Sequence, residues 1–407
     1  MAREQELQTI LRNSVEQGDL AGAVALIYRD GQTQCAFAGW RDIENGLPME
    51  RDTNFRIASM TKPITSVAAL MLVDEGRIKL EDPISTVAPE FANMKVLRSP
   101  DGPLEEAEDA SRPITFENLL THRAGLTYAD FHRGPIAQAY RDALGWEIDS
   151  VVAPDEWIRR LAGLPLIAQP GMAMTYGTAT DLLGFLIARI ERAPLGAVLA
   201  RRIFDPLGMR DTSFLVPRKK RNRRAAAYGF DEQGRLEKCL TRDGVFVEER
   251  PEHMAFASGG AGLWSTVDDY LKFARIFLGD GEVDGTRLLR PETLARMMTN
   301  HLMGGERVNP GWIGLGSERG FGLGVAVVLK PDDADMARRG SEGTVSWPGA
   351  FGGWWQADPK ENSVFVFLAH NIVTLAQMAK GIGLGVWAAI GDAQRLAYPG
   401  VACPQRE

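Results

Sequence analysis

Ser59-Met60-Thr61-Lys62 is the most informative segment of this sequence, because it places a hydroxyl and an amine one helical turn apart. The residues after it show the apolar spacing of a buried helix, at Ile64, Val67, Ala68, Met71 and Leu72. Pro63 is tolerated only in the first turn of a helix, so the helix begins close to Ser59. Residues three apart share one face of a helix, so the Lys62 amine can reach the Ser59 hydroxyl.

A serine hydroxyl becomes a good nucleophile only when a base takes its proton. A lysine near a helix N-terminus, partly buried and beside a second cation, is favoured in the uncharged form that can act as this base. The alternative for a lone Ser-x-x-Lys is a serine that caps the helix and a lysine in solvent. Other motifs must decide between the two.

Composition excludes several classes of protein. The chain has 407 residues, of which 45% are hydrophobic and 24% charged, which is typical of a soluble protein with two joined lobes. A net charge of −7 argues against nucleic acid or an anionic membrane as a partner. One basic run spans residues 218–224, but no aromatic residue interrupts it, so we expect a solvated connector helix rather than a nucleic-acid site.

Cysteine content and hydropathy indicate the compartment. Three widely spaced cysteines predict neither a disulfide framework nor a zinc site. The N-terminus lacks the apolar region of a secretory signal, and no apolar stretch reaches the about 20 residues that span a bilayer. We therefore expect a cytoplasmic protein with no membrane partner.

The order of predicted elements indicates an α/β (α+β) fold. Strands are expected at both ends of the chain, with an Asp-Gly hairpin turn between the first two, at residues 23–28, 33–38, 322–329, 353–357 and 363–369. Helices are expected at residues 7–15, 116–120, 154–161, 180–191, 195–204, 265–278 (opened by a capping box at residues 265–268) and 374–390. This order predicts one antiparallel sheet, built from both termini and flanked by helices, in a domain of residues 1–81 and 217–407. Residues 82–216 would form an inserted all-α lobe that covers an active-site cleft.

Two further segments could join Ser59 and Lys62. Tyr176 follows a Pro-Gly turn and precedes an amphipathic helix, so its phenol could act as an acid or base beside a lysine. The small residues of segment 347–353 allow backbone to pass close to a ligand, as an oxyanion hole requires. A core aromatic and a glycine-rich strand edge are the structural alternatives. Gly-x-Ser-x-Gly, the nucleotide-binding loops and His-Glu-x-x-His do not occur, so we expect no cofactor and no metal.

In this order and spacing, the motifs resemble the serine β-lactamase and penicillin-binding-protein superfamily. The chain is most similar to the class C β-lactamase-like branch, in particular the family VIII carboxylesterases, over residues 5 to 390. The resemblance implies that Ser59 is acylated and that Lys62 and Tyr176 transfer protons. It further implies an oxyanion hole made by the backbone N–H groups of Ser59 and Ala350. Family-like stretches also occur at residues 119–126 and 259–266.

The departures from the family pattern predict the substrate class. The β-lactamase motif Tyr-x-Asn is Tyr176-Gly177-Thr178 here, and Lys-Thr-Gly is Trp347-Pro348-Gly349, without a cation for a substrate carboxylate. Losing that charged contact removes about 1.5–3 kcal/mol, so neutral, apolar acyl compounds fit better than carboxylated β-lactams. Substrate-binding candidates are Trp347, Gly349, Phe351 and Tyr128. Only some of the aromatic side chains Trp347, Phe351, Trp354 and Trp355 can face the substrate, because side chains alternate along a strand.

The predicted function is a serine carboxylesterase that acts on a small-molecule ester. An amidase, a weak β-lactamase and an acyltransferase would use the same motifs, and a non-catalytic binding protein could keep the fold. Core packing is the alternative for Tyr128, Phe131 and Trp146. His122 is expected to be structural, and Asp181 to cap or pair near a helix start. The oligomeric state is left open, a homo-oligomer included.

Overall fold

The structure is a computed structural model that describes residues 2–145, 149–239, 241–242, 245–246, 256–302, 307–311 and 314–398. A single sheet of eight strands forms its centre, in the order β16-β17-β18-β19-β20-β1-β2-β3. The strands are β1 (Gly22–Arg29), β2 (Gln32–Asp42), β3 (Leu47–Pro48), β16 (Arg319–Phe321), β17 (Ala326–Val328), β18 (Val345–Gly349), β19 (Gly353–Asp358) and β20 (Ser363–Ala369). Among the described residues, no helix is long and apolar enough to cross a membrane.

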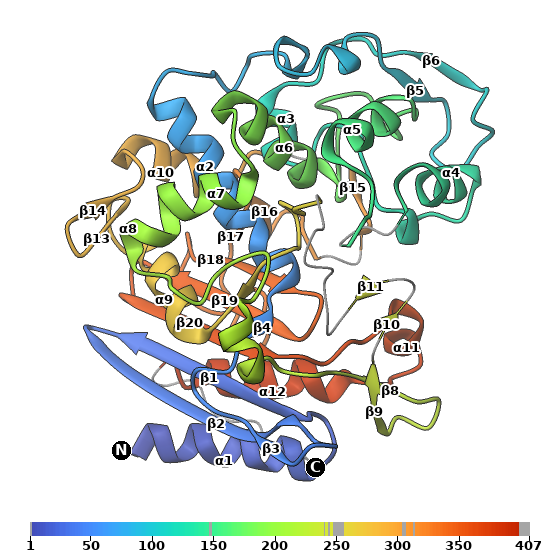
Figure 1. Ribbon diagram of the computed structural model, residues 1–407. Coiled ribbons are helices and arrows are strands. Elements are labelled where there is room, and N and C mark those ends of the chain that lie inside the picture. Colours follow the sequence, from blue (N-terminus) through green and yellow to red (C-terminus); the bar gives the residue numbers. More distant parts are fainter. Residues whose placement is uncertain are drawn as a thin grey trace.

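The two ends of the chain meet in the middle of this sheet. Strand β1 pairs antiparallel with β20, with Ala23 opposite Ala369, so the first and last strands lie side by side (Figure 1). This confirms the predicted antiparallel sheet built from both termini. Every residue of β20 is buried, because helices cover both faces of the sheet.

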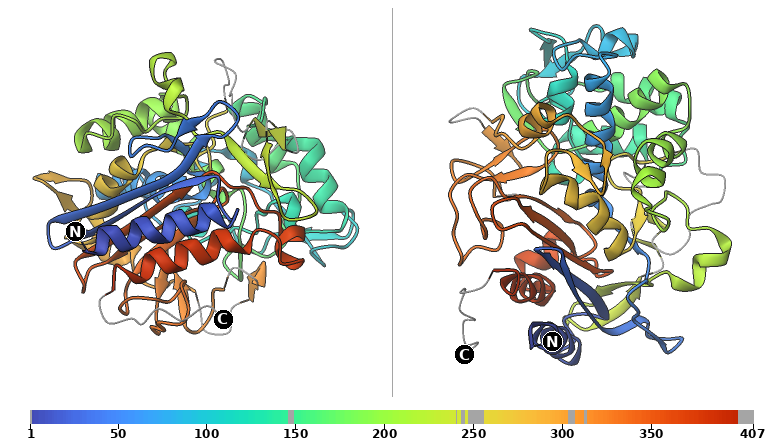
Figure 2. Two further views of the ribbon diagram at one scale, coloured as in Figure 1. Left: turned by 90° about the horizontal axis from the view of Figure 1, so that it is seen from below. Right: turned by 90° about the vertical axis from the view of Figure 1, so that its left-hand side faces the viewer.

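The sheet faces divide the apolar residues of each strand by their alternation. On the outer face, Ala25 and Phe367 pack against α1 (Ala2–Glu16) and α12 (Leu384–Arg395), which run side by side in Figure 2. The inner face, with Val24 and Leu368, joins the main core. That core includes α2 (Thr61–Asp74) and α9 (Val267–Ala274), which position the site described below.

Glycines alter two predicted elements. The strand expected over 322–329 is shortened to β17, because residues 322–325 form the turn between β16 and β17, where Gly324 has φ +93°. A Cβ on Gly324 would lie 2.1 Å from Ser66 Oγ, so only glycine fits there. The helix expected over 374–390 is instead α11 (Leu375–Ala379) and α12, separated where Gly381 and Gly383 take positive φ.

The described part of residues 82–216 contains the α-helices α3 (Phe116–Leu120), α4 (Pro135–Leu144), α5 (Pro154–Ala162), α6 (Ala179–Glu191), α7 (Leu195–Leu199) and α8 (Asp205–Leu207). The expectation that residues 82–216 form an all-α lobe was wrong, because this segment also contains strands. Strands β5 (Lys95–Leu97) and β6 (Ala107–Asp109) pair with each other, and β7 (Ala173–Thr175) pairs with β15 (Arg307–Asn309). These strands have only three residues each, too few for a readable alternation. The boundaries 82 and 216 remain a prediction.

Shorter elements complete the fold. Helix α10 covers Pro291–Met297. The remaining strand pairs are β4 (Phe55–Arg56) with β12 (Trp264–Ser265), β8 (Ala227–Phe230) with β9 (Leu236–Cys239), β10 (Thr241–Arg242) with β11 (Val245–Phe246), and β13 (Glu282–Val283) with β14 (Thr286–Arg287).

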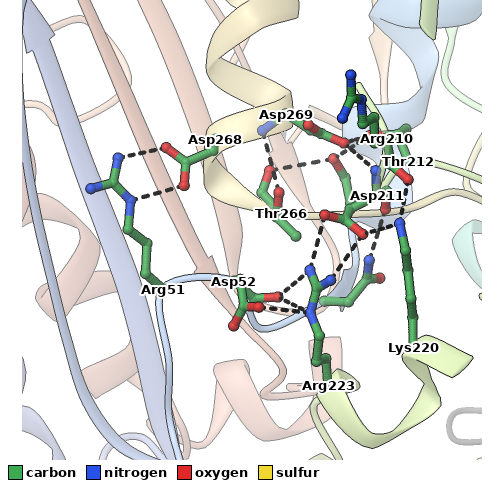
Figure 3. Close-up of polar contacts among 12 residues, drawn as sticks. Arg51, Asp52, Arg210, Asp211, Thr212, Lys220, Arg223, Thr266, Asp268 and Asp269 are labelled. Carbon is green, nitrogen blue, oxygen red and sulfur yellow. Dashed lines mark hydrogen bonds and ion pairs between the residues drawn. The ribbon is translucent and has the colours of Figure 1, made fainter. Parts of the chain in front are cut away.

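The basic run forms a short 3₁₀ helix, Arg218–Arg223, as a connector between two elements. Part of its charge is neutralised within the protein. Arg223 pairs with both Asp52 and Asp211, and Lys220 Nζ lies 2.6 Å from Asp211 Oδ1 (Figure 3). These contacts hold the connector against the rest of the molecule, and they give Lys220 and Arg223 a structural role.

Candidate active site

Ser59 lies in a strained turn at the start of α2. It is the middle residue of a 3₁₀ turn, Ala58–Met60, that leads directly into the helix. Ala58 has φ +45°, which is uncommon for a residue with a side chain, and such strain concentrates at functional positions. Ala58 and Met60 are fully buried, whereas Ser59 is partly exposed. The turn therefore presents the Ser59 hydroxyl outside an otherwise buried segment.

The Lys62 amine is the hub of the polar contacts around Ser59. Lys62 is only 1% exposed, and its Nζ lies 3.3 Å from Ser59 Oγ. The same Nζ lies 2.9 Å from the Gly260 carbonyl oxygen and 3.1 Å from the Tyr128 hydroxyl. A carbonyl can only accept, so Lys62 donates to Gly260. The helical spacing read from the sequence thus brings Lys62 to Ser59.

Tyr176 completes a triangle with Ser59 and Lys62. Its hydroxyl lies 2.9 Å from Ser59 Oγ, and the centre of its ring lies 4.7 Å from Lys62 Nζ. The backbone N–H of Tyr176 donates to the Asn309 carbonyl, so the pairing of β7 with β15 holds the residue in place. The Trp347 indole N–H donates to the Tyr176 hydroxyl over 3.2 Å, which orients the phenol.

Tyr128 contacts Lys62 and the ring of Tyr176. It had been selected only as a residue that could line the substrate site. In the structure its side chain is 7% exposed, its hydroxyl contacts Lys62, and its ring lies 5.7 Å from that of Tyr176. Phe131, from the same segment, stacks on Tyr176 at 6.1 Å. Trp146 lies outside the described residues.

The segment with Trp347 passes close to the turn that carries Ser59. A Cβ on Gly349 would lie 2.6 Å from the Ile57 carbonyl oxygen, so Gly349 allows contact between two backbones. Ala350, the next residue, is exposed. Phe351 is buried and packs with Ala58.

Only one of the three tryptophans in segment 347–355 contacts Tyr176. The Trp347 ring lies 5.3 Å from Tyr176 and 5.1 Å from Phe321. Trp354 belongs to the outer core with α1 and α12, and Trp355 packs against Tyr270 and Phe277 in the main core. Alternation along β19 therefore puts Trp354 and Trp355 on opposite faces of the sheet, whereas Trp347 in β18 is the cross-strand partner of Trp355 on the inner face.

A buried carboxylate holds the loop that meets Lys62. Asp181 Oδ1 accepts from the Ser258 hydroxyl over 2.5 Å and from the Gly260 N–H over 3.0 Å. Burial raises the pKa of Asp181, while the charge of Lys62 acts to lower it. Asp181 is in the first turn of α6, where it was expected to cap or pair. Its link to Gly260 was missed, although the glycine run at residues 259–262 was a signal for a close approach.

His122 lies behind Tyr176, with ring centres 4.8 Å apart. Burial, aided by the positive charge of Lys62, holds the pKa of His122 well below its usual value of 6.5. The imidazole is therefore neutral and packs the site, as the sequence predicted. Among the residues that the structure describes, no group of three or more His, Cys, Asp or Glu side chains is placed to hold a metal ion.

Three comparisons agree on the kind of protein that this fold and site define. Protein Rv1367c of Mycobacterium tuberculosis is 43% identical over 376 residues, 91% of this chain and 90% of that protein. Esterase EstB of Burkholderia gladioli is 32% identical and covers 86% of both chains. The solved structure of EstCE1, a hydrolase with promiscuous acyltransferase activity, matches with a TM-score of 0.78 and 26% identity over 96% of this chain and 98% of that chain.

The chain is therefore a serine hydrolase. More particularly, it belongs to the beta-lactamase family, whose model matches residues 7–379. The match covers the eight-stranded sheet and residues 82–216 alike, in agreement with the family fold expected from the motifs.

Proposed function

We propose that this protein is a metal-independent serine carboxylesterase that works through an acyl-enzyme on Ser59. One observation carries the proposal: Ser59 Oγ lies within hydrogen-bond distance of both the Lys62 amine and the Tyr176 hydroxyl. A nucleophile held by two proton-transfer groups is the arrangement that acyl transfer requires. The similarity to EstB favours esters as the substrates.

The hydrogen-bond inventory of Lys62 suits the role of base. Lys62 can take the Ser59 proton only in its uncharged form, in which the amine has two N–H groups and one lone pair. The two N–H groups match Gly260 O and Tyr128 Oη, which leaves the lone pair for the Ser59 proton. In our proposal, Ser59 attacks the ester carbonyl carbon as Lys62 takes this proton. Tyr176 then passes a proton to the departing alcohol, and water attacks the acyl-enzyme along the reverse route.

The oxyanion of the tetrahedral intermediate needs donors that are already in place. We assign this role to the backbone N–H groups of Ser59 and Ala350. The contact of Gly349 with the Ile57 carbonyl supports the assignment, because it brings the two segments together just before each donor.

The surroundings of Ser59 favour a neutral, apolar acyl group. Trp347, Phe131 and Tyr176 form an aromatic cluster beside the hydroxyl, and Trp347-Pro348-Gly349 carries no cation. A carboxylated β-lactam would lose a charge-assisted contact there.

Replacing Ser59 with Ala tests the proposal. We expect wild type to cleave p-nitrophenyl acetate and butyrate, and the S59A variant to retain less than about 1% of this rate, because the covalent step is removed. A chromogenic cephalosporin should turn over poorly. Ser66→Ala is a matched control on the same helix, since Ser66 Oγ has no hydrogen-bond partner among the described residues. Undiminished ester cleavage by S59A would refute the assignment.

Transfer to an alcohol or amine is the second candidate, favoured by the promiscuous acyltransferase activity of EstCE1. Transfer and hydrolysis share the acyl-enzyme and differ in what attacks it. Product analysis with an added alcohol separates them: an ester product formed at the expense of the free acid would establish transfer. An amide substrate in the same assay would reveal an amidase.

A further inference from the structure

A completely buried ion pair lies next to the proposed active site and has no task in the chemistry above. Arg56 and Asp149 form a two-pronged contact, with Nη1 to Oδ2 and Nη2 to Oδ1 both at 2.8 Å. Both side chains are 0% exposed. Arg56 is in β4, three residues before Ser59, whereas Asp149 belongs to the inserted segment.

Such a pair is weak evidence for a role in stability. Removing two charges from water costs free energy that their attraction repays only in good geometry. Two apolar side chains of similar volume are often as stable or more stable in the same place. A buried pair does differ from an apolar one in a single respect: it accepts only one relative placement of its two partners.

On the nucleophile side, Arg56 belongs to β4, which leads to Ser59, and contacts the turn that carries Ala350. Its guanidinium carbon lies 5.7 Å from the centre of the Phe351 ring, and Phe351 directly follows Ala350. The same carbon lies 5.9 Å from the Trp264 ring in β12, the strand that pairs with β4. The Arg56 side chain therefore connects the β4 and β12 pair to the turn that carries Ala350.

On the other side, Asp149 is linked to the wall that holds Tyr128. Ser150, the next residue, donates its hydroxyl to the Leu144 carbonyl at the end of α4. Tyr140 of the same helix accepts the Thr127 N–H at its hydroxyl over 3.4 Å. Thr127 precedes Tyr128, whose hydroxyl contacts Lys62. The chain of contacts runs from Asp149 to the proposed base.

We propose that Arg56 and Asp149 are positioning residues, which fix the Ala350 turn and the Tyr128 wall relative to Ser59. Neither side chain is assigned a contact with substrate. The inference rests on the proposed function, because it concerns the same acyl-transfer site. It extends that function by identifying an ion pair that fixes the position of residues 82–216 relative to the strand that leads to Ser59.

The test replaces the pair by apolar residues of similar size, Arg56→Met together with Asp149→Leu. We expect the double variant to melt within a few degrees of wild type, while kcat for p-nitrophenyl butyrate falls by about 10-fold to 100-fold and KM changes little. Misplacing groups by about 1 Å can cost a factor of this size. A merely structural pair would change the melting temperature without this selective loss of kcat.

Arg51 and Asp268 provide a matched control (Figure 3). They also form a two-pronged contact, through Nε and Nη2 of Arg51 at 2.9 and 2.7 Å, but their side chains are 49% and 37% exposed. Arg51→Met with Asp268→Leu should leave kcat unchanged. If the Arg56 double variant does not fold, Asp149→Asn is assayed below its melting transition, where the same loss of kcat is expected.

The rate at which a fluorophosphonate labels Ser59 separates the two proposals. If wild type is labelled and hydrolyses esters, and the folded Arg56 double variant is equally fast in both reactions, this inference alone is overturned. A wild type that neither labels nor cleaves esters would overturn the proposed function, and this inference with it. Slower labelling and a lower kcat in the variant support the positioning role.

Discussion

Tyr128 and Tyr176 are two buried tyrosines beside the Lys62 amine, yet only the Tyr176 hydroxyl contacts Ser59. Tyr176 contacts Ser59 Oγ at 2.9 Å and receives the Trp347 N–H, whereas Tyr128 contacts Lys62 Nζ at 3.1 Å. Both rings flank the amine, with centres 4.7 and 5.3 Å from Nζ.

A short distance to Lys62 therefore does not by itself identify a proton-transfer group. A general acid or base must be within hydrogen-bond reach of the atom whose proton moves. Tyr176 satisfies this condition at Ser59, and Tyr128 satisfies it only at the amine. We therefore expect unequal effects when the two hydroxyl groups are removed.

The largest effect is expected from Tyr176→Phe. This variant keeps the ring against His122 and Trp347 but removes the hydroxyl on Ser59, so kcat for p-nitrophenyl esters should fall by about 100-fold to 10,000-fold. Steady-state kinetics at saturating ester measures the loss. A fall of less than about 10-fold would remove Tyr176 from the proton-transfer pair.

A smaller effect is expected from Tyr128→Phe. The lost hydrogen bond to Lys62 contributes about 0.5–1.5 kcal/mol, which corresponds to a decrease in kcat of roughly 2-fold to 10-fold. The same assay applies, with the melting temperature as a check on folding. A decrease in kcat as large as that of Tyr176→Phe would contradict the assignment of different roles to the two hydroxyl groups.

The smallest effect is expected on the pH dependence of the free energy of unfolding, through His122, which packs against Tyr176. Folded His122 stays neutral because its pKa is well below 6.5, but the unfolded chain takes up a proton as the pH falls through 6.5. Acid therefore favours unfolding, by up to about 1.4 kcal/mol per pH unit from this one group. Asparagine tolerates the positive φ of +54° at this position, so His122→Asn tests the effect.

Denaturant titrations of wild type and His122→Asn at pH 8, 6.5 and 5.5 would measure it. Below pH 6.5 the free energy of unfolding should decline less steeply in the variant than in wild type. Above pH 6.5 the two slopes should agree. Equal slopes at every pH would contradict a neutral, buried His122.

The sequence could predict the parts of the site that depend on local periodicity. Ser59 is in the 3₁₀ turn that leads into α2 and Lys62 is in the first turn of α2, so a spacing of three residues in continuous helical backbone makes them neighbours. The sheet from both termini was equally readable, since apolar strands cluster at the two ends of the chain. Where glycines interrupt a pattern, as at Gly324 and Gly381, local periodicity was misleading, because it does not reveal where a chain reverses.

Contacts between distant segments could not be read in this way. The sequence suggested Tyr176 through its turn and family position, but nothing local predicts that Tyr128 meets Lys62 or that Asp181 holds Gly260. Those contacts join residues that are 66 and 79 positions apart. Which residues meet depends on how residues 82–216, which include α6, pack against α2 and the loop with Gly260.

The spacing of neighbouring residues was enough to predict the helix that begins close to Ser59, the approach of Lys62 to Ser59 and a sheet with strands from both ends of the chain. The folded structure was needed to show which phenol contacts Ser59, which carbonyl accepts the Lys62 N–H and which arginine is buried. These outcomes depend on the packing of segments far apart in the chain, where a shift of about 1 Å makes or breaks a hydrogen bond.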